Sequence, residues 1–412
     1  MVIIGGGAAG CMAAVFAANQ GAEVLVLEST PRLMNKVRIT GKGRCNVTNA
    51  GDAPSFYAHV VRNPRFLKSA YTAFDNRALM DFFEKLGVPL KTERGQRVFP
   101  QSDRAHDIAD ALAKEMEKCG VRVLYKTKAQ ALNMENGRVK AVQACGGRTF
   151  ALDACIVATG GRSYPVTGST GDGYRLARQA GHTVVPTQPS LCPVVTEETW
   201  VADLAGLSLK NVGLKAEVNG KKVFYDQGEM LFTHKGVSGP LVLSASAHLE
   251  RDAWPQSALI LDWKPALTEE QVNARLLREI QFAPNREVKT MMIQLVPKNA
   301  APILPTLAGI DPALPCNALT KQQRRKLTEQ LKHTKLSVRA AGPMEEAIVT
   351  RGGVNVKEIQ PKSMQSKRAE NLFFAGEVLD LDAYTGGYNL QIAFSTGVAA
   401  GLAAAKTDNE QR

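Results

Sequence analysis

The sequence predicts an α/β fold in which a Rossmann-like nucleotide-binding domain is combined with a β-rich domain and a small helical domain. Three observations lead to this prediction. The N-terminus joins a short apolar run to a glycine-rich turn and a helical segment. Residues 190–265 alternate in strand fashion, and residues 267–333 have helical spacing. A chain of 412 residues is long enough to build two or three such domains.

The N-terminal segment consists of an expected strand, a turn, a helix and a second strand. The run MVII precedes GGGAAG, with glycines at Gly5, Gly7 and Gly10, and the strand AEVLVLE ends on Glu28, 18 residues later. The first glycine permits a tight turn, the second lets a pyrophosphate approach, and the third allows close packing of helix and strand. The helix N-terminus attracts the phosphates. A carboxylate at Glu28 can accept hydrogen bonds from ribose hydroxyls and would repel a 2′-phosphate, which disfavours NADP at this site.

The rest of the chain favours FAD over NAD as the dinucleotide. Residues 121–158 are expected to form a β-meander with a hairpin turn at Asn136-Gly137, and an apolar strand then leads into ATGG. This arrangement is typical of flavoproteins of the two-dinucleotide-fold type. Near the C-terminus, the strand LFFAGE precedes Gly386-Gly387, which opens a long apolar helix. The N-terminus of that helix can stabilise negative charge on a flavin ring.

A second nucleotide-binding motif of this type is missing from the sequence. GSTGDG at 168–173 has a different glycine spacing and lacks the flanking strand, helix and acid. NAD(P)H, as a possible electron donor, would therefore bind transiently at the flavin rather than in a domain of its own.

The composition is that of a globular protein without a metal centre or a membrane span. Hydrophobic residues make up 44% and charged residues 22%, and no run of 18 apolar residues occurs. The seven cysteines include no CxxC pair, so we expect free thiols and no metal. We also expect a cytoplasmic location, and the oligomeric state stays open.

The formal net charge of +12 is distributed unevenly. Residues 31–77 hold nine basic and two acidic residues, and residues 265–340 hold twelve and six. The second stretch includes an amphipathic helix, TKQQRRKLTEQLKHT, with Arg324, Arg325 and Lys326. This helix is either a solvated surface or a contact for RNA phosphates. Because no aromatic residues are interleaved, a base-stacking platform is not expected there.

Seven motifs occur in one order along nearly the whole chain: GGGAAG with Glu28, TGKGRCNVTN, ATGG, TGSTGDGY, GEMLFTHKGVSGP, VTRGGVNVKEI and AGEVLDLDAYTGGYNLQIAFSTG. In these motifs the chain closely resembles the YhiN-like/BaiN-like FAD-dependent oxidoreductases. The resemblance implies an FAD-binding domain built from both chain ends, 1–189 and 343–412. It also implies an inserted β-rich substrate domain, 190–266 with 334–342, and a helical domain, 267–333. Members of this family include reductases of conjugated C=C bonds, and one branch makes dihydrouridine in large-subunit ribosomal RNA.

The motifs and the resemblance together predict the residues that bind FAD. They are Gly5, Gly7, Ala8, Ala9, Gly10, Glu28, Ser29, Lys36, Gly43, Arg44, Cys45, Asn46, Ala129, Thr159, Gly160, Gly376, Glu377, Gly386, Gly387, Asn389, Leu390 and Gln391.

The expected reaction is hydride transfer from reduced flavin to an electron-poor double bond. For uridine the hydride goes to C6 and an acid protonates C5, so the protein must orient the base and supply a proton. The candidate donors are Cys45 and His234, followed by Tyr164, Tyr384 and Tyr388.

The roles of the cysteines and of His234 stay open at this stage. Arg44 could lower the pKa of the Cys45 thiol, but Cys45 could equally be a small residue packed in a cofactor loop. His234 could be a hydrogen-bonded structural histidine. Cys192 is a weaker candidate near the site, and Cys11 is expected in the core.

Three functions are consistent with these observations. The first is conversion of uridine to dihydrouridine in 23S ribosomal RNA, with ribosomal RNA as the partner and substrate. The second is a small-molecule enoyl or amine oxidoreductase. The third is a flavin-bound RNA-binding factor without turnover.

Overall fold

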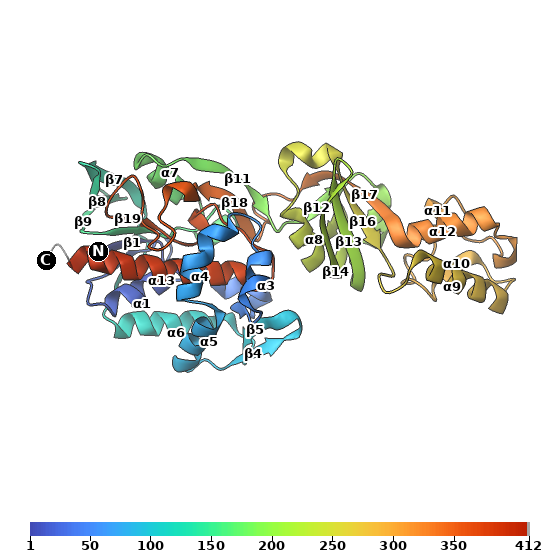
Figure 1. The fold of residues 1–412 in the computed structure, drawn as a ribbon, viewed down its shortest axis with the longest axis horizontal. Helices are drawn as coiled ribbons and strands as arrows, with labels where there is room; N and C mark the ends of the chain where they lie inside the picture. Colours follow the sequence, from blue (N-terminus) through green and yellow to red (C-terminus); the bar gives the residue numbers. More distant parts are fainter. Residues whose placement is uncertain (410–412) are drawn as a thin grey trace. The chain divides into compact units, whose positions relative to one another are not determined.

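The computed structural model describes residues 1–409, and the chain divides into two units. The first unit is Met1–Ser190 with Met344–Arg412, and the second is Leu191–Pro343. Both chain ends therefore belong to the first unit (Figure 1). The division of the inserted region into a β-rich and a helical domain stays a prediction.

A five-stranded parallel sheet forms the centre of the first unit. Its order is β19 (Leu372–Phe374), β10 (Cys155–Val157), β1 (Val2–Ile4), β2 (Leu25–Leu27) and β6 (Arg122–Leu124). Ile3 is paired with Ile156 on one side and Val26 on the other. Strands β1, β10 and β19 are buried throughout, as expected for parallel strands with covered faces, and this explains their unbroken apolar sequences. The predicted Rossmann-like α/β fold is confirmed.

Helices α1 (Ala8–Ala18) and α13 (Tyr388–Asn409) pack side by side in the first unit (Figure 1). A Cβ atom added at Gly397 would lie 2.4 Å from the Ala9 carbonyl oxygen, and one at Gly401 would lie 2.4 Å from that of Ala13. Both contacts advance by four residues along both helices, so the two helices run in the same direction. The two backbones approach closely because the facing residues are glycines and alanines.

Smaller elements complete the first unit. Its other helices are α2 (Asn35–Ile39), α3 (Ala53–Ala58), α4 (Lys68–Ala73), α5 (Asn76–Lys85), α6 (Ala105–Lys118) and α7 (Asp172–Gln179). The unit also has three small antiparallel sheets. The first has the order β3 (Thr48–Asn49), β5 (Arg97–Pro100) and β4 (Leu90–Glu93), and the second has the order β7 (Ala129–Glu135), β8 (Arg138–Ala144) and β9 (Thr149–Ala151). The third pairs β11 (Val184–Ser190) with β18 (Val349–Val354). The predicted hairpin turn at Asn136-Gly137 joins β7 to β8, with φ of 48° and 74° at its two residues.

The second unit contains a closed barrel. Its strand order is β12 (Val194–Thr196), β15 (Gly236–Ser238), β14 (Lys221–Thr233), β13 (Ser208–Val218), β16 (Ser257–Asp262) and β17 (Thr334–Ala341), with helix α8 (Pro240–Ser246) between β15 and β16 in the chain. The predicted turn at Asn219-Gly220 joins β13 to β14. The remaining helices are α9 (Glu269–Phe282), α10 (Val288–Met292), α11 (Ile303–Leu307) and α12 (Lys321–His333). Capping boxes at Thr268 and Thr320 begin α9 and α12.

Candidate functional site

The carboxyl edge of the parallel sheet gathers predicted site residues from distant parts of the chain. The glycine-rich turn follows β1, Glu28 follows β2, Thr159 and Gly160 follow β10, and Gly376 follows β19. The chain runs from β1 outward to β2 and β6, and then crosses to β10 on the other side of β1. Ligands of open α/β sheets bind at such a switch point, beyond the carboxyl ends of the strands.

In the glycine-rich turn, two glycines lie against neighbouring backbone atoms and a third faces open space. Gly5 has φ of 102°, and a Cβ atom there would lie 2.5 Å from the Ala158 carbonyl oxygen. A Cβ atom at Gly10 would lie 1.9 Å from the Gly5 carbonyl oxygen, whereas one at Gly7 would meet no atom within 4 Å. Gly5 and Gly10 are therefore required by packing. Gly7 leaves open space at the start of α1, where the first helical N–H groups have no partner within the helix.

Glu28 is buried at the end of β2 and is oriented by backbone groups. Its carboxylate oxygens accept 2.7 Å hydrogen bonds from the Gly6 and Thr30 N–H groups, and the Ser29 hydroxyl lies 3.4 Å away. A Cβ atom at Gly168, which has φ of 102°, would lie 2.8 Å from the Thr30 methyl carbon. The GSTGDG loop therefore lies beside Glu28, so a segment that sequence reasoning set aside belongs to this edge.

Three further predicted residues lie near the same edge. The Thr127 N–H group donates to the Glu28 carbonyl oxygen at 2.8 Å, which places Ala129 two residues beyond that contact. Gly160 has φ of 71° and faces the Ser169 hydroxyl. The Thr159 hydroxyl is buried and has no hydrogen-bond partner among the described residues. A buried hydroxyl without a partner is unfavourable, so a ligand atom at this position would stabilise it.

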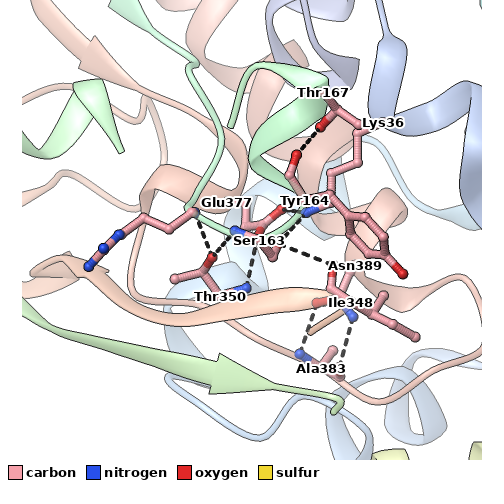
Figure 2. A network of polar contacts seen from close by, with 10 residues as sticks. Lys36, Ser163, Tyr164, Thr167, Ile348, Thr350, Glu377, Ala383 and Asn389 are labelled. Carbon is pink, nitrogen blue, oxygen red and sulfur yellow. Dashed lines mark hydrogen bonds and ion pairs between the residues drawn. The ribbon is translucent and has the colours of Figure 1, made fainter. Parts of the chain in front are cut away.

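Lys36 and Glu377 form a polar network with Ser163 (Figure 2). The Lys36 Nζ atom lies 2.7 Å from both the Glu377 Oε2 atom and the Ser163 Oγ atom. Ser163 Oγ lies 3.0 Å from Glu377 Oε1, which also accepts a hydrogen bond from the Thr350 N–H group at 2.8 Å. Ser163 and Thr350 were missed by sequence reasoning. The only signals were that Ser163 closely follows the motif ATGG and that Thr350 lies within the motif VTRGGVNVKEI.

The start of α13 is held in place by glycines and buried amides. Gly386 and Gly387 have φ of 120° and 97°, and a Cβ atom at Gly387 would lie 2.4 Å from the Thr48 backbone. The Asn389 side chain accepts from the Ala383 N–H group at 3.0 Å and donates to its carbonyl oxygen at 2.8 Å (Figure 2). These contacts fix the loop before the helix.

Two further amides and a glycine connect α13 to its neighbours. The Asn46 amide is oriented so that its nitrogen donates to backbone carbonyl oxygens and its oxygen accepts from the Gly387 N–H group at 3.1 Å. Gln391 is fully buried and bonds the Thr48 hydroxyl at 2.6 Å, so it ties α13 to β3. Leu390 is partly exposed. Gly376, with φ of 78°, packs against the Ala9 side chain.

The N-termini of α1 and α13 open in one direction with a fixed stagger. Ala9 is the second residue of α1, and the Gly397 that faces it is the tenth of α13. The first turn of α13 therefore lies about eight residues, or ~12 Å, ahead of the first turn of α1. Two positive helix ends with this offset along the helix axes suit an extended ligand that carries negative charge at two places.

The segment that carries Gly43, Arg44 and Cys45 is a strained turn. A Cβ atom at Gly43, which has φ of 84°, would meet no atom within 4 Å. The Arg44 guanidinium lies over the Phe99 ring and pairs with Glu93 at 2.5 Å and with Asp103 at 2.6 Å. The predicted phosphate contact of Arg44 stays a prediction, and in this structure its charge is already paired.

Cys45 is a buried neutral thiol. Its side chain is fully buried, and this burial raises its pKa to about 12, although a bond to Thr40 acts in the opposite direction. Of the two alternatives left open for Cys45, the structure favours the packed residue, because the Arg44 guanidinium is held by Glu93 and Asp103. Cys11 lies in the core as expected, and burial raises its pKa strongly.

His234, Cys192 and the candidate RNA contacts lie in the second unit. His234 is exposed in the turn between β14 and β15. Cys192 is buried, and its N–H group donates to Ser246 at 3.0 Å. On α12, Arg325 is exposed, whereas the Arg324 Nε atom donates to Asn273 at 2.9 Å. Lys326 is also exposed. His234 and Cys45 thus belong to different units.

The described residues contain neither a membrane-spanning helix nor a metal-binding cluster. Within residues 1–409, no helix is both long and apolar enough to cross a bilayer. Within the same range, no group of three or more His, Cys, Asp or Glu side chains has the arrangement of a metal site.

The fold and the sheet edge define a Rossmann-type dinucleotide-binding protein. The model of the HI0933-like protein Rossmann domain matches residues 1–403. The chain therefore belongs to the HI0933-like family, a family of FAD-dependent oxidoreductases with a Rossmann-type FAD-binding domain.

Similar proteins include curated relatives with two different names. A 3-dehydro-bile acid delta(4,6)-reductase of Clostridium scindens is 32% identical over 410 residues, 98% of each chain. A ribosomal RNA dihydrouridine synthase of Haemophilus influenzae is 32% identical over 406 residues, 97% of each chain. Among solved structures, a quinol-fumarate reductase with menaquinol has a TM-score of 0.52 at 14% identity, and the match covers all of this chain and 71% of that one. This last likeness shows the fold alone.

Proposed function

We propose that this chain binds FAD along the carboxyl edge of its parallel sheet. The observation that carries the proposal is the stagger of α1 and α13. Their N-termini offer positive ends offset by ~12 Å along the helix axes, which suits a pyrophosphate at α1 and a flavin ring edge at α13. Glu28 would accept hydrogen bonds from the adenosine ribose, and the open space at Gly7 and the unpartnered Thr159 hydroxyl leave room for the ligand.

The proposed reaction is reduction of a C=C bond, with uridine in large-subunit ribosomal RNA as the leading substrate. Bound FAD, once reduced, supplies a hydride. The chain's own groups must then hold the pyrimidine flat, exclude water and deliver one proton. Two features support the RNA substrate: relatives of this length are named ribosomal RNA dihydrouridine synthases, and the chain has a net charge of +12. Arg325 and Lys326 on α12, with Arg324, are the proposed phosphate contacts.

The leading substrate is tested in cells. Mass spectrometry of ribosomal RNA from a strain that lacks this gene, beside the parent strain and a complemented strain, measures dihydrouridine directly. We expect a loss of dihydrouridine from 23S RNA that complementation restores. An unchanged level would exclude this substrate. NAD(P)H is proposed as a transient electron donor and the cytoplasm as the location, as required for access to ribosomal RNA.

A second candidate is reduction of a conjugated C=C bond in a small molecule. It is favoured by the relative named as a bile acid reductase, which matches this chain at the same identity as a ribosomal RNA relative. Purified protein with reduced FAD, mixed with uridine-containing RNA or with a conjugated enone, separates the two. A protein that holds FAD and binds RNA but reduces neither compound would instead be an RNA-binding factor without turnover.

A further inference from the structure

Half of the chain's eight tyrosines gather beside the start of α13. We call this group the aromatic cluster, and its members are Phe56, Tyr57, His59, Tyr71, Tyr384 and Tyr388. The rings of Phe56 and Tyr71 stack at 3.9 Å, and Phe56 also contacts Tyr388 at 5.9 Å. His59 is the only imidazole among these six side chains.

The backbone fixes His59 to the loop that precedes α13. His59 follows the last residue of α3, and its carbonyl oxygen accepts a 2.9 Å hydrogen bond from the Tyr384 N–H group. The next residue, Val60, pairs with Ala383 in an antiparallel bridge. The position of His59 is therefore coupled to the same loop that Asn389 holds at the helix start.

The orientation of the His59 ring is set on two sides. Its face stacks on Tyr388 with centroids 4.6 Å apart and an angle of 11°, and Tyr384 meets it edge to face at 5.5 Å. Its Nδ1 atom lies 2.6 Å from the Ser55 carbonyl oxygen. Because a carbonyl oxygen only accepts, Nδ1 must carry a proton whether or not the ring is charged. Nε2 is thus the nitrogen that gains and loses a proton.

We propose that His59 is the proton donor of the C=C reduction. This role rests on the proposed function. In the overall step, one carbon of the double bond gains a hydride from the reduced cofactor, and the other gains the proton from His59 Nε2. The Nε2–H bond breaks, and the imidazolium becomes a neutral imidazole that keeps its Nδ1 proton, hydrogen-bonded to the Ser55 carbonyl oxygen. Solvent water then returns a proton to Nε2.

Three of the other candidate donors fit this role less well. The Cys45 thiol is fully buried, and its raised pKa makes it a weak acid. Tyr384 and Tyr388 are phenols, whose ordinary pKa near ~10 makes them weaker acids than an imidazolium. His59 is partly exposed, whereas Cys45 is fully buried. The orientation of an imidazole through its other nitrogen is the usual arrangement for such a group.

The test separates proton delivery from cofactor reduction. Wild-type protein and His59→Gln are loaded with FAD, reduced with dithionite without oxygen, and mixed with 23S RNA lacking dihydrouridine or with cyclohexenone, while flavin reoxidation is followed by stopped flow. We expect His59→Gln to slow reoxidation by the C=C compound about 100-fold or more. FAD content and reoxidation by oxygen should match the wild type, because neither needs this proton. Tyr384→Phe keeps the ring that meets His59 and removes the rival phenol, so a loss as large as that of His59→Gln would assign the proton to Tyr384 instead.

A second measurement does not depend on activity. Long-range ¹⁵N–¹H NMR of histidine-labelled apoprotein, with the His59 signals assigned by their loss in His59→Gln, should show a neutral ring protonated on Nδ1. A neutral ring protonated on Nε2, or undiminished reoxidation of His59→Gln by the C=C compound, would overturn the role of His59 alone. Wild-type protein that holds FAD but is reoxidised by neither compound would overturn the proposed function and this role with it.

Discussion

Lys36 and Glu377, 341 positions apart in the sequence, meet with Nζ and Oε2 only 2.7 Å apart. Both side chains are mostly buried, with exposed fractions of 22% and 19%, so each would leave an uncompensated charge without the other. Lys36 is the second residue of α2, and Glu377 follows β19 at the carboxyl edge of the sheet. Their contact joins the two chain ends at the proposed FAD site.

Replacing Lys36 is expected to weaken FAD binding. Lys36→Met removes the charge but keeps most of the apolar stem, and it leaves Glu377 without its cation, so we expect FAD affinity to fall by about tenfold or more. Glu377→Gln with Lys36→Met should recover part of the loss, because the unpaired charge is then removed. Titration of apoprotein with FAD, followed by flavin fluorescence, measures both. Equal affinity in wild type and Lys36→Met would contradict this role.

The two glycines of the turn should respond differently to alanine. Gly10→Ala places a methyl group where the Gly5 carbonyl oxygen stands 1.9 Å away, so we expect unfolding to become easier by about 2–4 kcal/mol. Gly7→Ala meets no protein atom within 4 Å, so its stability should change by less than about 0.5 kcal/mol. Its methyl group would nevertheless occupy the proposed pyrophosphate position and lower FAD affinity. Thermal denaturation measures the stability of both variants, and FAD titration measures their affinity. A Gly7→Ala variant that binds FAD as tightly as the wild type would contradict the proposed pyrophosphate position.

Cys45 is expected to be unreactive in the folded protein. Because burial raises the pKa of its thiol to about 12, the thiolate is scarce at all pH values below that, and the group is also shielded. Iodoacetamide should therefore label exposed Cys145 first and reach Cys45 only on unfolding. Peptide mass spectrometry after timed labelling measures both. Cys45→Ala should retain most C=C reduction, and a loss of about 100-fold would restore Cys45 as a proton donor.

Charge reversal on α12 tests its contact with RNA. Arg325→Glu with Lys326→Glu changes two exposed residues and spares Arg324, which bonds Asn273. We expect RNA affinity to fall about tenfold or more, and we expect affinity to depend less steeply on salt concentration. Lys221→Glu with Lys222→Glu changes the same charge at exposed positions of β14 and serves as the control. Similar losses in both double variants would mean that α12 is only a solvated surface.

The Rossmann-like fold was predictable from the sequence because its signals are local. The glycines of GGGAAG, the acid after β2 and the apolar strands lie within short windows, and each has one dominant physical reading. The network of Lys36, Ser163 and Thr350 depends on three chain segments meeting at one edge, and no single window carries that information. His59 was missed for the same reason, since its partner rings come from residues more than 300 positions later. The pKa of Cys45 stayed open at the sequence level because burial, which raises it, depends on the fold, and the neighbouring Arg44 side chain is held by Glu93 and Asp103.

The central claim is that the carboxyl edge of the sheet, with α1 and α13, binds one FAD. The most direct measurement is the absorbance spectrum of the purified protein, with its FAD content per chain, before and after reconstitution with FAD. The account predicts a yellow wild-type protein with about one FAD per chain, and a Gly7→Ala variant that holds less FAD or none. A wild-type protein that stays colourless and free of flavin after reconstitution would contradict it.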